Sequence, residues 1–174
     1  IYKSDEFVDL CRGPHLESTG KIHNTGKIIF KGNASFAQDS LEGTIEFSQN
    51  DENFNQYIPQ IKYEKLSFKG TTPKILRDTT KNIIVEKEFF SDEKTIIKYD
   101  SRINFESKGN TIHYGMINPS YLFGNFILNG DHIQHIEGTG IYRNLTLNNQ
   151  YNAIISNGGG FVISNELILI NGIL

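Results

Sequence analysis

Short apolar runs separated by polar turns recur along the chain from about residue 26. In several runs apolar and polar residues alternate, as in Thr44-Ile45-Glu46-Phe47 and Asn144-Leu145-Thr146-Leu147, and a period of two is typical of β-strands. The turns are short and rich in Asn and Gly, residues that tolerate a positive φ. The pattern predicts strands at Lys27–Lys31, Gly43–Phe47, Leu66–Lys69, Ile83–Glu86, Thr95–Tyr99, Ile103–Glu106, Thr111–Tyr114, Phe126–Leu128, Ile133–Ile136, Leu145–Leu147, Ala153–Ile155, Gly160–Ile163 and Glu166–Ile170.

Residues 43–76 and 124–155 repeat one pattern. Tyr63 and Ile75 lie 79 positions before Tyr142 and Ile154, respectively. A long internal period in a strand-rich chain favours stacked repeats, so we expect an all-β fold, a right-handed parallel β-helix or solenoid. A β-sandwich or closed barrel is the alternative, because hairpins need similar turns. The last strand, Leu167 to Ile170, is apolar on both faces, and we expect it to be buried on both.

Composition and charge narrow the choice of partners. With twelve Phe, sixteen Gly, one Met and no Trp, the chain suits pleated surfaces better than helices. The net charge of −3 is too small to indicate nucleic acid or an anionic membrane as a partner. No run of eighteen apolar residues exists, so we expect no membrane-spanning helix. The first residue is Ile, and we expect the chain to be a piece of a longer protein.

One resemblance covers most of the chain. The residues that carry it are Asn24-Thr25-Gly26-Lys27-Ile28, Gly32-Asn33-Ala34-Ser35-Phe36 and the stretch from Gly138 to Asn149. They resemble the repetitive regions of bacterial surface and adhesin-like proteins of the Bacteroidetes type. The resemblance implies a secreted or cell-surface location and a non-enzymatic, structural or adhesive role. Glycans or a host cell surface are the implied partners, and we expect self-association through the open ends of the solenoid.

The tyrosines bear on the glycan prediction. They could line a glycan-binding face, because a phenol ring stacks and its hydroxyl forms hydrogen bonds. Stacking inside or along the solenoid is the alternative. The residues concerned are Tyr57, Tyr63, Tyr99, Tyr114, Tyr121, Tyr142 and Tyr151.

A second resemblance concerns the first 22 residues. The segment Phe7-Val8-Asp9-Leu10-Cys11-Arg12-Gly13-Pro14-His15, followed by Ser18-Thr19-Gly20, resembles the editing domain of threonyl-tRNA synthetase. The resemblance implies that Cys11 and His15 line a site that hydrolyses serine mischarged on the threonine tRNA. It also implies a cytoplasmic enzyme with tRNA as partner.

The chemistry of this pair is open to more than one role. A thiol and an imidazole can bind an amine, position a water or hold a metal, and zinc is a candidate only if the chain is an editing fragment. No other cofactor is expected. The chain departs from the family in two respects: only six residues precede Phe7, which leaves no room for the family's upstream His-x-x-x-His pair, and Trp is absent.

These resemblances divide the chain at residue 22. We expect residues 1–22 to be an editing-motif segment and residues 23–174 to be the solenoid. The tetrapeptide Thr-Gly-Lys-Ile occurs at Thr19–Ile22 and again at Thr25–Ile28, where a synthetase fragment could have been joined to a repeat protein. Alternatively, it is one solenoid unit used twice. Our main prediction is a non-enzymatic solenoid of a secreted surface protein, and the alternative is a synthetase-related editing fragment.

Other polar residues favour structural roles. His132 and His135 are three apart, so on a strand they would point to opposite faces, which disfavours a shared metal site. We expect His113 to face solvent from its strand. Asp51-Glu52 and Asp92-Glu93 could bind calcium, but solvated turns are the simpler interpretation.

Overall fold

The computed structural model describes residues 2–4, 7–9, 26–77, 82–99, 103–117, 124–156 and 160–174. This part of the chain is all-β and contains no helix. The strands are β1 (Tyr2–Ser4), β2 (Phe7–Asp9), β3 (Lys27–Phe30), β4 (Ser40–Ser48), β5 (Gln56–Tyr57), β6 (Lys62–Lys69), β7 (Lys74–Leu76), β8 (Ile83–Ser91), β9 (Ile96–Tyr99), β10 (Ile103–Ser107), β11 (Asn110–His113), β12 (Met116–Ile117), β13 (Gly124–Leu128), β14 (Gln134–Glu137), β15 (Ile141–Asn148), β16 (Ala153–Ile155) and β17 (Val162–Asn171).

From β3 onward every described strand pairing is parallel, and the strands form three columns. The β10 column runs through β4, β6, β8, β10, β13, β15 and β17. The β11 column runs through β3, β4, β6, β8, β11, β14 and β16. The β9 column runs through β5, β7, β9, β12 and β15. Long strands serve two columns: the first half of β8 pairs with β10 and its second half with β11.

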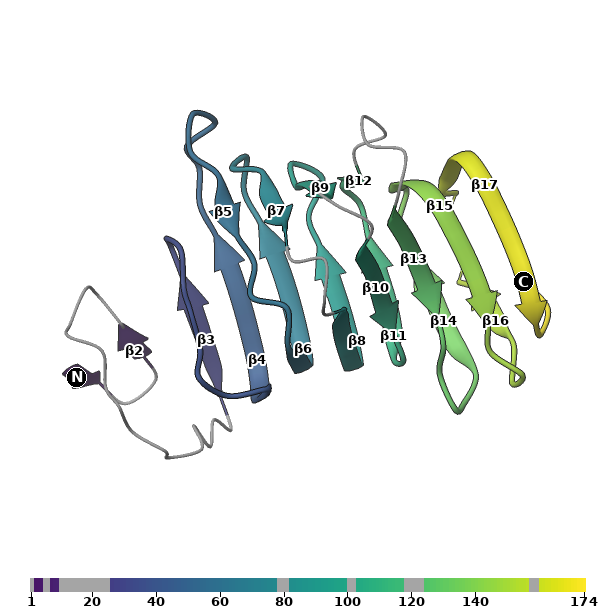
Figure 1. Ribbon diagram of the computed structural model, residues 1–174, viewed down its shortest axis with the longest axis horizontal. Helices are drawn as coiled ribbons and strands as arrows, with labels where there is room; N and C mark the ends of the chain where they lie inside the picture. The colour runs from purple at the N-terminus through teal and green to yellow at the C-terminus, as the bar shows by residue number, and fades with distance from the viewer. Residues whose placement is uncertain are drawn as a thin grey trace.

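This arrangement is a solenoid, in which the chain passes through each column once per coil. Figure 1 shows the coils stacked side by side from β3 at one end to β17 at the other. The expected fold class, an all-β parallel solenoid, is therefore confirmed. Parallel ladders exclude the sandwich and barrel built from hairpins, because a two-residue turn can join only antiparallel strands.

The structural repeat is shorter than the repeat seen in the sequence. Register partners in successive coils are 17 to 25 positions apart, for example 17 for Lys27 with Thr44, 22 for Ile83 with Phe105 and 25 for Thr111 with Ile136. Tyr63 lies in the β10 column, where it pairs with Val85. Tyr142 follows Ile141, which pairs with Met116 in the β9 column. The two copies of the 79-residue sequence repeat thus lie in different columns of the solenoid. They share only the alternation of inward and outward residues.

The interior contains a continuous stack of aromatic rings. We call Phe68, Phe89, Phe105, Phe126 and Tyr142 the aromatic spine. Their centroids are 5.5 Å apart for Phe68–Phe89, 4.6 Å for Phe89–Phe105, 5.0 Å for Phe105–Phe126 and 5.1 Å for Phe126–Tyr142. All five side chains are at most 1% exposed. These inward rings come from different columns and meet in the interior, where their contacts stabilise the stack.

The last strand differs from the prediction. Leu167 and Leu169 of β17 pair with Leu145 and Leu147 of β15. The β15 leucines are 1% and 0% exposed, whereas the β17 leucines are 42% and 56% exposed. The expectation that this strand is buried on both faces is wrong, because no described strand covers its outer side. At the opposite end, β2 contacts β3.

Gly138 fills a corner that requires glycine, and this gives a first prediction. Its φ is +101°, and an added Cβ would lie 2.2 Å from the carbonyl oxygen of His113. Gly138→Ala is expected to lower the free energy of unfolding by about 1–3 kcal/mol, because it adds both a clash and backbone strain. Equilibrium urea unfolding checks this. Gly160→Ala is the control, since nothing lies within 4 Å of the added methyl group, and an equal loss in both variants would contradict the explanation.

Candidate functional site

The editing-like motif begins in a short hairpin. Strand β2 supplies its first three residues and pairs antiparallel with β1, with Asp9 opposite Tyr2 and Phe7 opposite Ser4. The first three residues of the motif therefore lie in the β1–β2 ladder. This ladder lies beside the first coil, since β2 contacts β3. Cys11 and His15 lie outside the described residues, so their roles, and zinc as a metal for them under the editing alternative, stay predictions.

A buried Ser–His pair lies elsewhere, in the β11 column. His113 is 0% exposed, and its Nδ1 lies 2.5 Å from Oγ of Ser91 in the preceding coil. Its Nε2 lies 3.3 Å from the carbonyl oxygen of Ile141. A carbonyl can only accept, so Nε2–H donates to Ile141 and Nδ1 accepts the Ser91 hydroxyl proton. The expectation that His113 faces solvent is wrong, because this strand turns its polar Thr111 and His113 inward.

The environment of His113 holds it neutral. Burial lowers its pKa to about 4, while the hydrogen bond to Ile141 acts in the opposite direction. Its ring centroid is 4.7 Å from that of Tyr142 and 6.2 Å from that of Phe89. A serine beside a neutral imidazole has the composition of a nucleophile and its base. Both side chains are fully buried, however, so no substrate can reach them, and the pair connects two coils instead.

Further polar side chains are buried at the corners of the coils. Lys74 is 0% exposed and donates from Nζ to the carbonyl oxygen of Thr72 at 2.8 Å. Burial lowers the pKa of Lys74 to about 8, partly offset by the charge of Asp92. Gln134 donates from Nε2 to the carbonyl oxygens of Ser107 and Gly109. These side chains satisfy backbone groups that the corners leave without ladder partners. Sequence reasoning missed them, since a lysine inside a strand pattern normally faces solvent.

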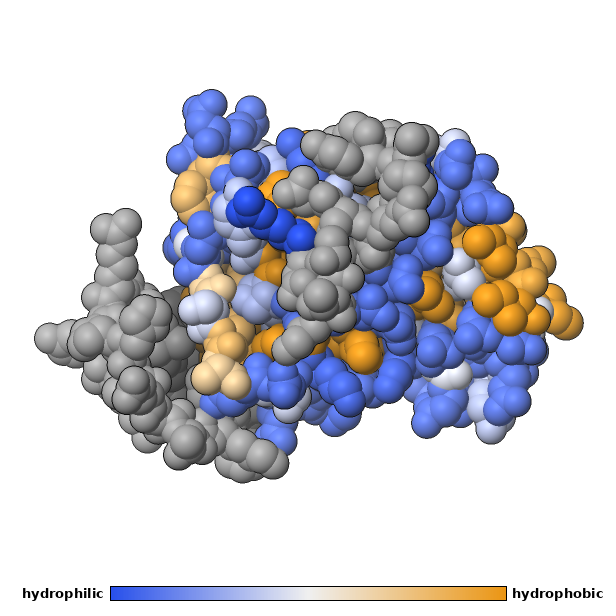
Figure 2. Space-filling model, in the orientation of Figure 1, coloured by the Kyte–Doolittle hydropathy of each residue, from blue (hydrophilic) through white to orange (hydrophobic). Residues whose placement is uncertain are grey.

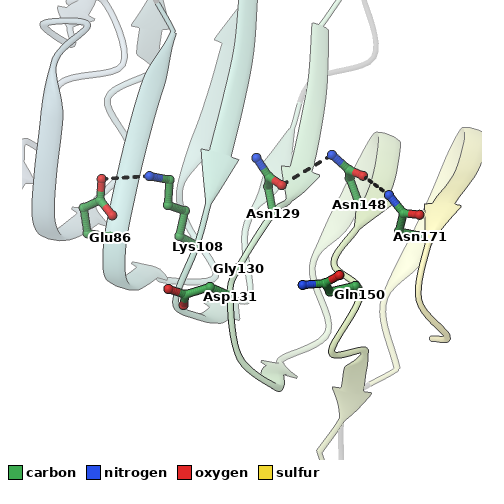
Figure 3. Close-up of a pocket in the computed structure, with 8 residues that line it drawn as sticks. All are labelled: Glu86, Lys108, Asn129, Gly130, Asp131, Asn148, Gln150 and Asn171. Atoms are coloured by element: carbon green, nitrogen blue, oxygen red, sulfur yellow. Dashed lines mark hydrogen bonds and ion pairs between the residues drawn. The ribbon is translucent and has the colours of Figure 1, made fainter.

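A polar groove of about 480 Å³ follows one corner of the stack. Figure 3 shows two rows of bonded side chains across successive coils. Lys108 pairs with Glu86 at 3.1 Å, while Asn171 donates to Asn148 at 2.8 Å and Asn148 to Asn129 at 3.4 Å. The groove offers hydrogen-bonding groups but no nucleophile beside a base. Its rows join equivalent corners, which suits a stabilising role.

The remaining candidates stand apart. In the part of the chain that the structure describes, no three His, Cys, Asp or Glu residues gather closely enough to hold a metal ion. His132 lies 2.8 Å from Asp131, whereas His135 lies 3.3 Å from Oγ of Ser156. Asp51 accepts the backbone N–H of Asn53, and Asp92 accepts that of Gly70 in a neighbouring corner. These carboxylates stabilise turns.

The tyrosines do not form one exposed face. Tyr63, Tyr99 and Tyr142 are at most 3% exposed, and burial raises the pKa of each phenol. Tyr114 and Tyr151 are exposed. Tyr121 lies outside the described residues, and the prediction of glycans as partners stays a prediction. Over the described ranges no helix has the length and hydropathy needed to cross a membrane.

Comparison with known proteins bears on the first segment. Residues 1–37 match the family described as "Threonyl and Alanyl tRNA synthetase second additional domain". The chain is 42% identical over 71 residues to the threonine–tRNA ligase of Streptococcus uberis, a match that covers 37% of this chain and 11% of that protein. It is 39% identical over 69 residues to the ligase of Rhodopseudomonas palustris, covering 36% and 10%. No solved structure matches.

These matches correct the main functional prediction. The chain spans about a tenth of the length of the curated ligases that it matches. The similarity found is to threonine–tRNA ligases, and no adhesin-repeat family is shown, so the prediction of an adhesin function is wrong. The predicted secreted or cell-surface location stays a prediction. The resemblance of the repeats came from their alternating strands and Asn-Gly corners, which any parallel solenoid needs. The family match covers residues 1–37 and thus includes β3. The division of the chain at residue 22 stays a prediction.

Proposed function

We propose that this chain carries part of a threonyl-tRNA synthetase editing domain and hydrolyses serine mischarged on the threonine tRNA. The observation that carries the proposal is the match of residues 1–37 to the synthetase domain family. The threonine–tRNA ligase matches, at about 40% identity, support it. The partner would be tRNA and the location cytoplasmic.

The reaction is hydrolysis of the ester that joins the serine carboxyl to a ribose hydroxyl of the tRNA. Water adds to the ester carbonyl, the C–O bond to the ribose breaks, and free serine and uncharged tRNA leave. Under this proposal the His15 imidazole accepts a proton from the attacking water, as neutral histidines do near pH 7. The Cys11 thiol contacts the serine amine and fixes the ester next to that water.

Deacylation of serine-charged threonine tRNA tests the proposal. The whole chain is expected to release serine faster than buffer alone, and Cys11→Ala and His15→Ala are each expected to lower the initial rate by about tenfold or more. The readout is the loss of radiolabelled serine from acid-precipitated tRNA.

Two controls make the assay specific. His132→Ala removes an exposed histidine of the solenoid and should leave the rate unchanged. Threonine-charged tRNA should be hydrolysed more slowly than the serine-charged form. A rate for the whole chain equal to that of buffer, with the chain folded by circular dichroism, would refute the proposal.

A further inference from the structure

The C-terminal end of the solenoid presents an unusual apolar surface. Its exposed side chains, which we call the C-terminal end face, are Ile155, Val162, Leu167, Leu169, Ile170 and Ile173, with exposed fractions between 42% and 71%. Figure 2 shows hydrophobic residues gathered at this end of the molecule. Ile155 and the two leucines occupy positions whose partners one coil earlier are buried. The face is therefore a cross-section of the core.

Strand β17 also leaves a backbone edge open. It pairs with β15 on one side, and no described strand pairs with the other. Such an edge is normally protected by lysine, proline or a covering loop. The residues of β17 are Val162-Ile163-Ser164-Asn165-Glu166-Leu167-Ile168-Leu169-Ile170-Asn171, with neither lysine nor proline. Unpaired N–H and C=O groups beside apolar side chains attract another strand.

The sequence of β17 is nearly a palindrome about Ile168. Leu167 and Leu169 flank Ile168, and Asn165 and Asn171 stand three positions from it on either side. In an antiparallel pair, residues directly opposite each other point to the same face. A pairing of two β17 strands centred on Ile168 therefore places Leu167 opposite Leu169 of the second copy. The inward leucines of both copies then lie on one face.

From this self-complementarity we infer that the C-terminal end face binds a second copy of this chain, through antiparallel pairing of β17 with β17 about a two-fold axis at Ile168. The central residues Glu166 to Leu169 pair with β15 without a register shift, so the strand is regular where the copies meet.

Charge is compatible with this pairing. Glu166 is the one charged residue of β17 and stands opposite Ile170 of the second copy. The two Glu166 residues are then about 14 Å apart along the strands, beyond the screening length at physiological salt.

The geometry selects a closed dimer. At the opposite end of the stack β3 pairs with β4 alone among the described strands, but β2 lies in contact with it, so the two ends differ. A two-fold contact uses the C-terminal end of both copies at once and leaves none for a third. Association should therefore stop at two chains.

Sedimentation of the full chain over a concentration series tests the dimer. The expected mass rises from that of one chain to that of two and stops there. Ile168→Lys places two ammonium groups opposite each other at the axis and should raise the dissociation constant at least about tenfold. Ile133→Lys is the matched control, because Ile133 is 49% exposed in the turn before β14, away from the end face. A monomer at all concentrations, or growth beyond the dimer, would overturn the inference.

Cysteine cross-linking tests the register independently of charge and of any folding defect in the lysine variant. In a Cys11→Ser background, Ile168→Cys puts two thiols directly opposite, within the Cα separation that a disulfide accepts. Leu169→Cys puts them two residues out of register. Under mild oxidation the Ile168→Cys chain should form the covalent dimer at least about tenfold faster. Equal rates, or a faster Leu169→Cys chain, would exclude this pairing.

Discussion

Replacing Phe105 by alanine is expected to lower the free energy of unfolding by about 3–5 kcal/mol. Phe105 is 0% exposed and lies in the middle of the aromatic spine, with ring centroids 4.6 Å from Phe89 and 5.0 Å from Phe126. The substitution removes the transfer free energy of the ring and leaves a cavity between coils. Inward rings in the neighbouring coils cannot close that cavity without moving their own backbone ladders.

Phe90→Ala provides the matched control for Phe105. Phe90 is a half-buried phenylalanine on the outer side of β8 and contacts Tyr114 and the ammonium group of Lys69. Its loss should cost about 1 kcal/mol, since much of its surface already faces water. The comparison uses denaturant unfolding followed by circular dichroism, with the thermal midpoint as a second measure because repeat stacks can unfold in steps. A Phe105→Ala loss no larger than that of Phe90→Ala would show that the spine is not a principal source of stability.

The strands of the solenoid could largely be predicted from alternation, but their ends and exposure could not. Gly43–Phe47 is predicted as a strand, and the structure places it within β4. The strands of two or three residues β1, β2, β5, β7 and β12 were missed, because so few residues carry no period. The two last predicted strands merge into β17. Whether β17 is covered depends on what stacks against it, which alternation does not encode.

The buried polar residues mark a second limit. Alternation tells which residues share a face but assigns the inner face by hydrophobicity. In β11 the inward residues are Thr111 and His113, both 0% exposed, while Ile112 lies on the other face. That inversion is stabilised by partners from other coils, Ser91 and the Ile141 carbonyl. Such partners are set by coils of variable length, which place Ser91 22 positions before His113 and Ile141 28 positions after it. The 79-residue sequence repeat does not reveal that spacing.

For the editing motif, the sequence predicted the function better than the structure. Phe7 to His15 was recognised from residue identity alone, and the matches to synthetases support it. The solenoid pattern gave the correct fold and the wrong function, because the same corners and rungs serve any parallel stack. Residue types that perform chemistry thus indicate function more directly than periodicity does.

His113 should make the protein markedly less stable in mild acid. In the unfolded chain the imidazole has a pKa near 6.5, whereas burial lowers it to about 4 in the folded protein. Between these values the unfolded state binds the proton and the folded state does not. Stability from this group is therefore complete above about pH 6.5 and decreases as pH falls toward 4, by about 3 kcal/mol in all.

The hydrogen-bond geometry explains why the folded state resists protonation. Nδ1 of His113 already accepts the Ser91 hydroxyl, and a proton there would turn that acceptor into a donor and place a charge between Phe89 and Tyr142. Unfolding free energies measured from pH 7 to 4 should fall more steeply for the natural chain than for His113→Asn, which has no imidazole to titrate. His135→Asn, which removes an exposed histidine that contacts the Ser156 hydroxyl, should keep the natural slope. Proton NMR of the His113 ring offers a direct check, and a ring that titrates near pH 6.5 in the folded protein would contradict the burial argument.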